Sequence, residues 1–405
     1  MEQEQSKAVR FFYLDNIKTF LIILLILVHT AMTFGNIDGW YYYEPHNHLL
    51  TTNILIFFVA VNQAFLLALF FALSGFLTPA SADRKGNARF ITDRIKRLGL
   101  PFLAYLLIIT PVFAYLQQVN YMNLSIPFSQ FYFRMYRDFL FNGVGPMWFV
   151  LVLLIFTIGY TLLTPLFQSK RSGKETEMSP SKKFPSILIL FVVIILLALL
   201  NFLVRLQFPI NGWIDFRGVF LIDMSHIGQY IFFFVAGIMA FRNKWLSNLS
   251  DKTGRFWAWM LVPSLLGWPV MMLAGGIINN GVYPFLGGMS WQALVYCFWE
   301  ILCCMSACIG ILWFFKKRIN HSNLFIKQVN TVSFSVYCIH MPLVIGLGYL
   351  LSGLSVHPFV KFAGEGLISI ILCFSLAVIV KKFIAKGDKP LEFNKNASVR
   401  QQKAS

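Results

Sequence analysis

Long apolar runs alternate with short polar segments along the whole chain. A helix of about 20 apolar residues spans a bilayer, and the chain contains ten runs of that order. They are too long for the strands of a membrane barrel, so the pattern predicts an all-α, polytopic membrane protein. The ten predicted spans are 12–34, 51–78, 99–118, 146–168, 185–207, 224–242, 256–276, 290–315, 331–352 and 360–383.

Composition narrows the class of protein further. Of the 405 residues, 57% are apolar and only 13% are charged, against about 25% charged in soluble domains. This excludes a soluble globular domain and a disordered chain. We expect one transmembrane domain over residues 1–383, followed by a polar, basic tail over 384–405 with no further soluble domain. The first span is too long for a cleaved signal peptide.

The 34 Lys and Arg residues predict the orientation in the membrane. With the N-terminus inside, 29 of them fall in the predicted inner segments and five in the outer ones. By the positive-inside rule, both termini are then cytoplasmic. The net charge of +17 is therefore a signal of topology and of contact with membrane lipids, and we expect no nucleic-acid partner. No His/Cys spacing in the sequence predicts a metal site.

Ionisable residues inside apolar spans are costly and mark candidate sites. In the first span, His29 lies eleven residues after Lys18. Eleven helical steps place the two on one stripe, about 16 Å apart along the axis. Asp15 shares the face of Lys18. An imidazole in this position can act as a general base near neutral pH, and a core histidine bonded to a nearby carbonyl is the alternative.

Glu300 lies near the middle of the eighth span. A carboxylate at that depth pairs with a cation or takes a proton. We predict that Glu300 orients or charges His29. The alternative is a structural ion pair with an arginine such as Arg205.

Three further spans carry polar residues of interest. Tyr337 and His340 share one face of the ninth span, where a bonded core histidine is the favoured interpretation of His340. His226 begins the sixth span near the point where Arg205 ends the fifth. Together with Trp148 and three charged residues of the outer loop between these spans, they would form a polar mouth at the outer face. The loop residues are Asp215, Arg217 and Asp223. An interfacial belt of arginine and tryptophan is the alternative.

The segment after the second span is rich in arginine, with Arg89, Arg94 and Arg97. The basic residues would face water while the apolar residues face lipid, which predicts an interfacial amphipathic helix; these apolar residues are Phe90, Ile91, Ile95 and Leu98. Arginine forks suit a phosphate-rich cytosolic ligand, although lipid headgroups would satisfy them equally. Just before this segment, Ser74-Gly75 is a pair of small residues of the kind that permits close helix packing.

These motifs resemble the acyltransferase type three family of membrane O-acyltransferases. The opening signature of that family is a basic residue, ten intervening residues and a histidine, here Lys18 and His29, although the family more often has arginine first. FFALSGFL, the arginine-rich loop, MWFV around Trp148 and YCIHMP around His340 recur in the same order. FLVRLQFP and FWEILCC are similar to a branch labelled glucan biosynthesis or succinyl-transfer-like.

The resemblance implies transfer of an acyl group, acetyl or succinyl, from cytosolic acyl-CoA to a hydroxyl of an extracytoplasmic glycan or glycolipid. No tightly bound cofactor is implied, and the location would be a bacterial cell membrane. The arginines would meet the CoA phosphates, His29 would deprotonate the acceptor or carry the acyl group, and Glu300 would hold the His29 tautomer. The alternatives are a proton-coupled transporter or flippase of a small or lipid-linked sugar, and a non-catalytic scaffold.

Overall fold

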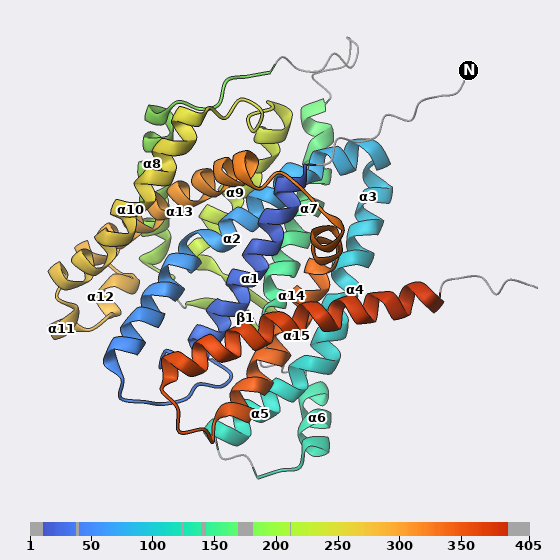
Figure 1. The fold of residues 1–405 in the computed structure, drawn as a ribbon, viewed down its shortest axis with the longest axis vertical. Coiled ribbons are helices and arrows are strands. Elements are labelled where there is room, and N and C mark those ends of the chain that lie inside the picture. Colours follow the sequence, from blue (N-terminus) through green and yellow to red (C-terminus); the bar gives the residue numbers. More distant parts are fainter. Residues whose placement is uncertain are drawn as a thin grey trace, which may run out of the picture.

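The computed structural model describes residues 11–37, 40–122, 125–138, 143–168, 181–210 and 212–387. Within those ranges, ten helices are long and apolar enough to cross a membrane, which confirms the predicted all-α, multi-pass fold (Figure 1). They are α1 (Phe12–Phe34), α2 (Leu49–Lys85), the composite third span (Asn87–Val119), α7 (Met147–Gln168), α8 (Ile187–Arg205), α9 (Ile227–Arg242), α10 (Asp251–Ala274), α13 (Trp291–Arg318), α14 (Leu324–Leu351) and α15 (Pro358–Gly387). Of the predicted tail, residues 388–405 lie outside the described ranges.

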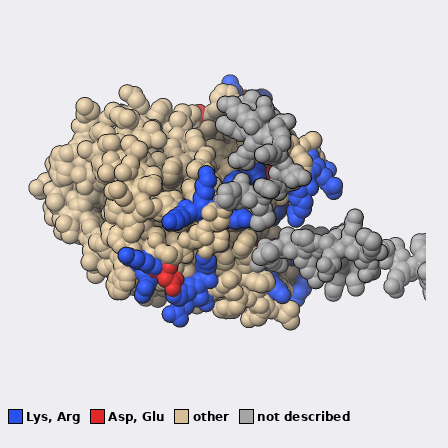
Figure 2. All heavy atoms as spheres, turned by 90° about the horizontal axis from the view of Figure 1, so that it is seen from above, with Lys and Arg blue, Asp and Glu red and all other residues tan. Residues whose placement is uncertain are grey.

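Several connections between spans lie towards two opposite ends of the bundle, while the segment between α10 and α13 lies at the left side of the view (Figure 1). The predicted outer end is at the bottom of that view, with the α1–α2 and α14–α15 connections, and the predicted inner end is at the top. Basic residues occupy the last turns of α2, α9 and α13 at the inner end. Figure 2 looks onto that end and shows Lys and Arg side chains gathered there with few acidic ones. Basic residues thus gather at the end of the bundle that the positive-inside rule predicts to be cytoplasmic.

The third span is one continuous helix with two wider turns. It consists of α3 (Asn87–Arg94), η1 (Ile95–Gly99), α4 (Leu100–Ala104), η2 (Tyr105–Ile109) and α5 (Thr110–Met122), where η1 and η2 are π-helical. Pro101 follows η1 and has no N–H for the carbonyl of Arg97, which accounts for the first wide turn.

The arginine-rich segment is helical, and it is continuous with the third span. Of the four residues expected to face lipid, Ile95 is 48% exposed, but Phe90 and Leu98 are 1% and 4% exposed and pack inside the protein. The expectation is therefore wrong for Phe90 and Leu98. Periodicity identified their common face correctly, but it cannot distinguish a face turned to lipid from one turned to other helices.

Helices α2 and α9 cross at backbone contact. A Cβ added to Gly75 would lie 2.0 Å from the carbonyl oxygen of Phe234, and one added to Gly237 would lie 2.1 Å from that of Ala72. Real Cβ atoms do not approach so closely, so each helix places a glycine against the main chain of the other. The expected close packing at Ser74-Gly75 is confirmed for Gly75.

Smaller elements fill the predicted outer end. They are α6 (Phe128–Arg137), the antiparallel hairpin of β1 (Trp213–Phe216) and β2 (Phe220–Asp223), the 3₁₀ turn η4 (Met224–His226), α11 (Ile277–Asn280) and α12 (Tyr283–Leu286). Three residues, 217–219, connect the strands. Arg217 and Gly218 both have positive φ there, and the Val219 amide donates to the carbonyl of Phe216 at 3.1 Å, which closes the turn. In the resulting register Trp213 lies opposite Asp223, and this pairing brings both residues to the cavity described next.

Candidate active site

A cavity of about 640 Å³ opens inside the outer half of the bundle, within the size range of small-ligand sites. Its wall carries aromatic side chains from five separate segments and polar side chains between them. The aromatic residues are Trp40, Tyr41, Trp148, Phe149, Trp213, Tyr230 and Tyr337. The polar residues are His29, Asn62, Gln63, Gln117, Asp215 and Asp223. Three of the predicted site residues, His29, Trp148 and Tyr337, therefore lie on one cavity.

The His29 ring is held by His340 from the opposite helix. His29 Nδ1 lies 2.9 Å from His340 Nε2, and His340 Nδ1 lies 2.6 Å from the carbonyl oxygen of Tyr337. A carbonyl can only accept, so His340 Nδ1 carries a proton and the Nε2 of a neutral His340 accepts. His29 Nδ1 must then donate to it. This assignment, made from the hydrogen-bond partners, leaves His29 Nε2 with a free lone pair.

Aromatic rings enclose this histidine pair. The Trp40 ring lies 4.8 Å from the His29 ring and the His340 ring lies 5.0 Å from it. Tyr337 packs 5.7 Å from His340, as their spacing predicted, and its hydroxyl donates to the carbonyl of Pro146. His340 is fully buried, whereas His29 is only half-buried and lines the cavity. His29 therefore faces the cavity and His340 supports it from behind.

Glu300 does not contact His29. Its Oε2 accepts from Arg205 Nη2 at 2.6 Å, and its Oε1 lies 2.9 Å from His226 Nε2. The alternative stated above, a structural ion pair with Arg205, is the arrangement in the structure. The residue that orients His29 is His340, which the sequence pattern marked without indicating its partner.

The Glu300 ion pair belongs to a buried cluster of four charged groups. His226 Nδ1 lies 2.6 Å from Asp223 Oδ2, and all four side chains, Arg205, Glu300, His226 and Asp223, are at most 6% exposed. Both ring nitrogens of His226 face carboxylates, which only accept when ionised, so both carry protons. The cluster then holds two cations and two anions and has no net charge, which makes its burial tolerable.

Asp223 connects this cluster to the cavity. It is the member of the cluster that lines the cavity. The sequence placed it in the polar mouth but indicated no role of its own for it. Burial raises its pKa, but the charges and hydrogen bonds of His226, Ser225 and Arg205 outweigh burial and lower the pKa to about 2. Asp223 is therefore a carboxylate at neutral pH. Its position in the charged outer loop next to His226 was the signal in the sequence.

The remaining predicted residues lie away from the cavity. Lys18 donates to Asp15 at 3.1 Å near the inner end of α1. Arg89 and Arg97 are exposed at the start of the third span, and Arg94 lies 4.9 Å over the Phe90 ring. Within the described ranges, these three arginines take part in no ion pair or hydrogen bond, so their guanidinium groups are available to a ligand.

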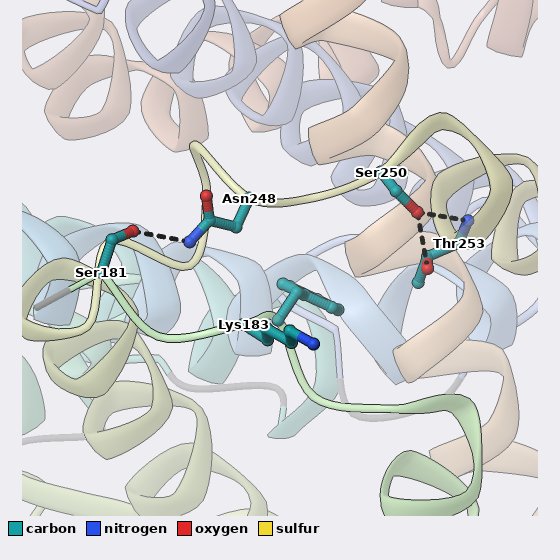
Figure 3. Close-up of a pocket in the computed structure, with 6 residues that line it drawn as sticks. Ser181, Lys183, Asn248, Ser250 and Thr253 are labelled. Atoms are coloured by element: carbon teal, nitrogen blue, oxygen red, sulfur yellow. Dashed lines mark hydrogen bonds between the residues drawn. The ribbon is translucent and has the colours of Figure 1, made fainter.

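A second cavity, of about 460 Å³, lies at the inner end between the segment preceding α8 and the one preceding α10 (Figure 3). Its polar groups are largely satisfied by each other: Asn248 Nδ2 donates to Ser181 Oγ at 2.7 Å, and Ser250 Oγ accepts from the Thr253 amide at 3.2 Å. None of the predicted site residues lines it. The first cavity, which three of the predicted site residues line, is therefore the candidate active site.

The fold and the first cavity define a polytopic membrane protein with an interior cavity that a bonded histidine pair adjoins. Residues 11–380 match the family model described as an acyltransferase domain. The chain therefore belongs to the acyltransferase type three family, as the motifs indicated.

Within that family, the chain is similar to proteins named glucans biosynthesis protein C. The chain is 28% identical over 238 residues to glucans biosynthesis protein C of Escherichia coli strain SMS-3-5, covering 58% of this chain and 59% of the relative. The protein of the same name from Shigella dysenteriae serotype 1 is 27% identical over 239 residues, with the same coverage. The chain thus matches about three fifths of the length of these relatives. No solved structure matches the chain significantly.

Proposed function

We propose that the protein is a membrane O-acyltransferase that moves an acyl group from cytosolic acyl-CoA to a hydroxyl of an extracytoplasmic glycan or glycolipid. The observation that carries the proposal is the free Nε2 of His29 on a cavity at the predicted outer side. Aromatic faces beside amide and carboxylate groups suit the apolar faces and hydroxyls of a sugar. The name of these relatives, glucans biosynthesis protein C, supports a glycan acceptor. The bacterial cell membrane would be the location.

In the proposed reaction His29 acts as a general base. Its Nε2 takes the proton of the acceptor hydroxyl as the oxygen attacks the thioester carbonyl. The tetrahedral intermediate then collapses, the carbon–sulfur bond breaks, and the CoA thiolate takes the proton from His29. An ester and CoA leave, and the enzyme is unchanged. Throughout, Nδ1–H stays bonded to His340, which fixes the orientation of the ring.

The donor would approach from the inner end. Arg89, Arg94 and Arg97 would bind the CoA phosphates through charge-assisted hydrogen bonds. From Arg97 to Tyr105 the third span rises about 12 Å, and the Tyr105 hydroxyl reaches the sulfur of Met341 on the cavity wall. The span that binds the nucleotide portion would thus run directly to the acyl-transfer site.

Acetyl is the favoured acyl group. A succinyl donor would need a cation for its distal carboxylate, and Arg205 was the candidate. Arg205 is fully buried, and its guanidinium is bound to Glu300 and to the carbonyl of Ser225. Arg205 is therefore bound within the ionic cluster and does not offer its charge to a succinyl carboxylate.

The test is CoA release from acetyl-CoA in proteoliposomes, with a glycan extract on the opposite side of the membrane. The wild type is compared with His29→Ala and with His48→Ala, an exposed loop histidine used as the control. Loss of a general base should lower transfer at least ~100-fold, while His48→Ala should behave as the wild type. Succinyl-CoA serves as a second donor.

Equal release by His29→Ala and the wild type would remove His29 from the chemistry. Retention of a radiolabelled acyl group on His29 would show that it carries the group covalently rather than acting as a base. If no donor supports release in folded protein, the acyl-CoA proposal is wrong, and proton-coupled transport of a sugar becomes the function to measure.

A further inference from the structure

The bonds of the Asp223 carboxylate leave it incompletely satisfied. Oδ1 accepts from Ser225 Oγ at 2.6 Å. Oδ2 accepts from His226 Nδ1 at 2.6 Å and from the Tyr230 hydroxyl at 3.3 Å. An ionised carboxylate offers about four acceptor positions. Three of these are occupied by protein donors, and the carboxylate lines the cavity.

The ionic cluster holds Asp223 in place and in its charged form. His226 is fixed between Asp223 and Glu300, and Glu300 is fixed by Arg205. These residues come from α8, the β2–η4 segment, and α13, so three parts of the bundle determine the position of one carboxylate. The favourable interactions within the cluster offset the cost of keeping that carboxylate ionised beside an apolar wall.

Asp223 and His29 lie on the same cavity but on different elements. Asp223 ends β2, where it pairs with Trp213, and the Trp213 ring packs 5.1 Å from that of Trp148. His29 lies on α1 beneath Trp40. A sugar ring that stacked on the tryptophans would have one hydroxyl directed to a fixed acceptor and another available to the base.

We propose that Asp223 is the residue that binds and orients the acceptor, accepting a hydrogen bond from a sugar hydroxyl so that a neighbouring hydroxyl faces His29 Nε2. The inference rests on the proposed function and assigns the acceptor-binding group within it. It also assigns a purpose to the buried cluster, which positions Asp223 and does not touch the reacting atoms. Arg205, Glu300 and His226 are therefore positioning residues.

The test separates acceptor binding from chemistry. Binding of a neutral gluco-oligosaccharide is followed by tryptophan fluorescence of the detergent-solubilised protein without any acyl donor. Asp223→Asn should bind roughly 10- to 100-fold more weakly, which is the loss of one charge-assisted hydrogen bond. Asp83→Asn is the control, because Asp83 is an exposed aspartate near the inner end of α2 that pairs with Arg242 and does not line the cavity, and it should bind as the wild type does.

Kinetics supply the second measurement. Hydrolysis of acetyl-CoA by water needs His29 but no acceptor, so Asp223→Asn should retain it while transfer to the oligosaccharide falls through a raised KM for the acceptor. Should Asp223→Asn fail to fold, Asp223→Glu keeps the charge but displaces it, and should show the same separation of transfer from hydrolysis.

Each outcome is decisive for one proposal or the other. Wild-type binding by Asp223→Asn, or a parallel fall of hydrolysis and transfer, overturns the role of Asp223. Asp223-dependent binding in a protein that releases no CoA supports this inference while the donor proposal fails. Normal transfer by Asp223→Asn together with its loss in His29→Ala leaves the proposed function intact and removes Asp223.

Discussion

His340 Nε2 lies 2.9 Å from His29 Nδ1, although the two residues are 311 positions apart in the chain. With the carbonyl of Tyr337 behind it, His340 determines which nitrogen of His29 carries a proton. The arrangement follows the same logic as other activated bases, in which a second group selects the tautomer and the orientation of the imidazole.

Replacing His340 should lower kcat while leaving the KM values for donor and acceptor nearly unchanged. His340→Leu removes the acceptor for His29 Nδ1–H, and loss of such a supporting bond typically costs 10- to 100-fold in activity. His340→Gln can accept through its amide oxygen and should recover part of the rate. Steady-state kinetics of both variants provide the check. Equal losses in the two would mean that packing, rather than the hydrogen bond, is what His340 contributes.

Replacing Glu300 should destabilise the protein. Glu300→Ala leaves Arg205 buried without a counter-ion, at a cost of about 3–5 kcal/mol. Thermal unfolding in detergent and the yield of folded protein should therefore fall sharply. Glu44→Ala provides a comparison, because Glu44 bonds Lys361 in a less buried pair at the outer end and should cost less. A Glu300 variant of wild-type stability would contradict the ionic-cluster interpretation.

Removing the uncommitted arginines should weaken donor binding only. Arg94→Gln combined with Arg97→Gln is expected to raise the KM for acetyl-CoA roughly 10-fold or more, at unchanged kcat, because each loses a charged contact with phosphate. The effect should shrink as ionic strength rises. Arg134→Gln on α6, at the opposite end of the protein, is the control. An unchanged KM in the double variant would place the donor elsewhere.

Adding a methyl group at the α2–α9 crossing should destabilise the bundle. Gly75→Ala places a Cβ against the carbonyl of Phe234, and overpacking of this kind costs about 1–3 kcal/mol. Gly267→Ala on α10 is the control, since a Cβ there meets nothing within 4 Å and alanine favours helix. Melting temperatures should fall for the first variant and stay constant or rise for the second.

Much of the fold could be predicted from hydropathy. The thickness of the membrane sets the length of each span, and backbone groups inside it must be hydrogen-bonded within the same helix. All ten predicted spans correspond to helices. The π-helical turns, α6 and the β1–β2 hairpin were not predicted. They depend on local backbone geometry or on packing at the bundle end, and neither leaves an apolar run of fixed length.

The candidate site was only partly predictable. His29, Tyr337, His340 and Glu300 stood out because each interrupts an apolar span. Which of them meet depends on how distant helices pack, and a single sequence carries no record of that. Glu300 was therefore assigned the partner that belongs to His340.

Asp223 could not be singled out as an interruption of an apolar span. It lies just outside a span, where carboxylates are common, so its polarity alone did not distinguish it. Its importance follows from the hairpin register and from the buried cations it meets.

The contact of α2 with α9 determines which parts of the cavity can change shape. With no side chain between the two main chains at Gly75 and Gly237, neither helix can slide or tilt against the other without a steric clash. The side of the cavity formed by Gln63 of α2 and Tyr230 of α9 is therefore a rigid body. Any adjustment of the cavity to the shape of an acceptor therefore has to come from its other walls, to which Trp40 and Trp213 belong.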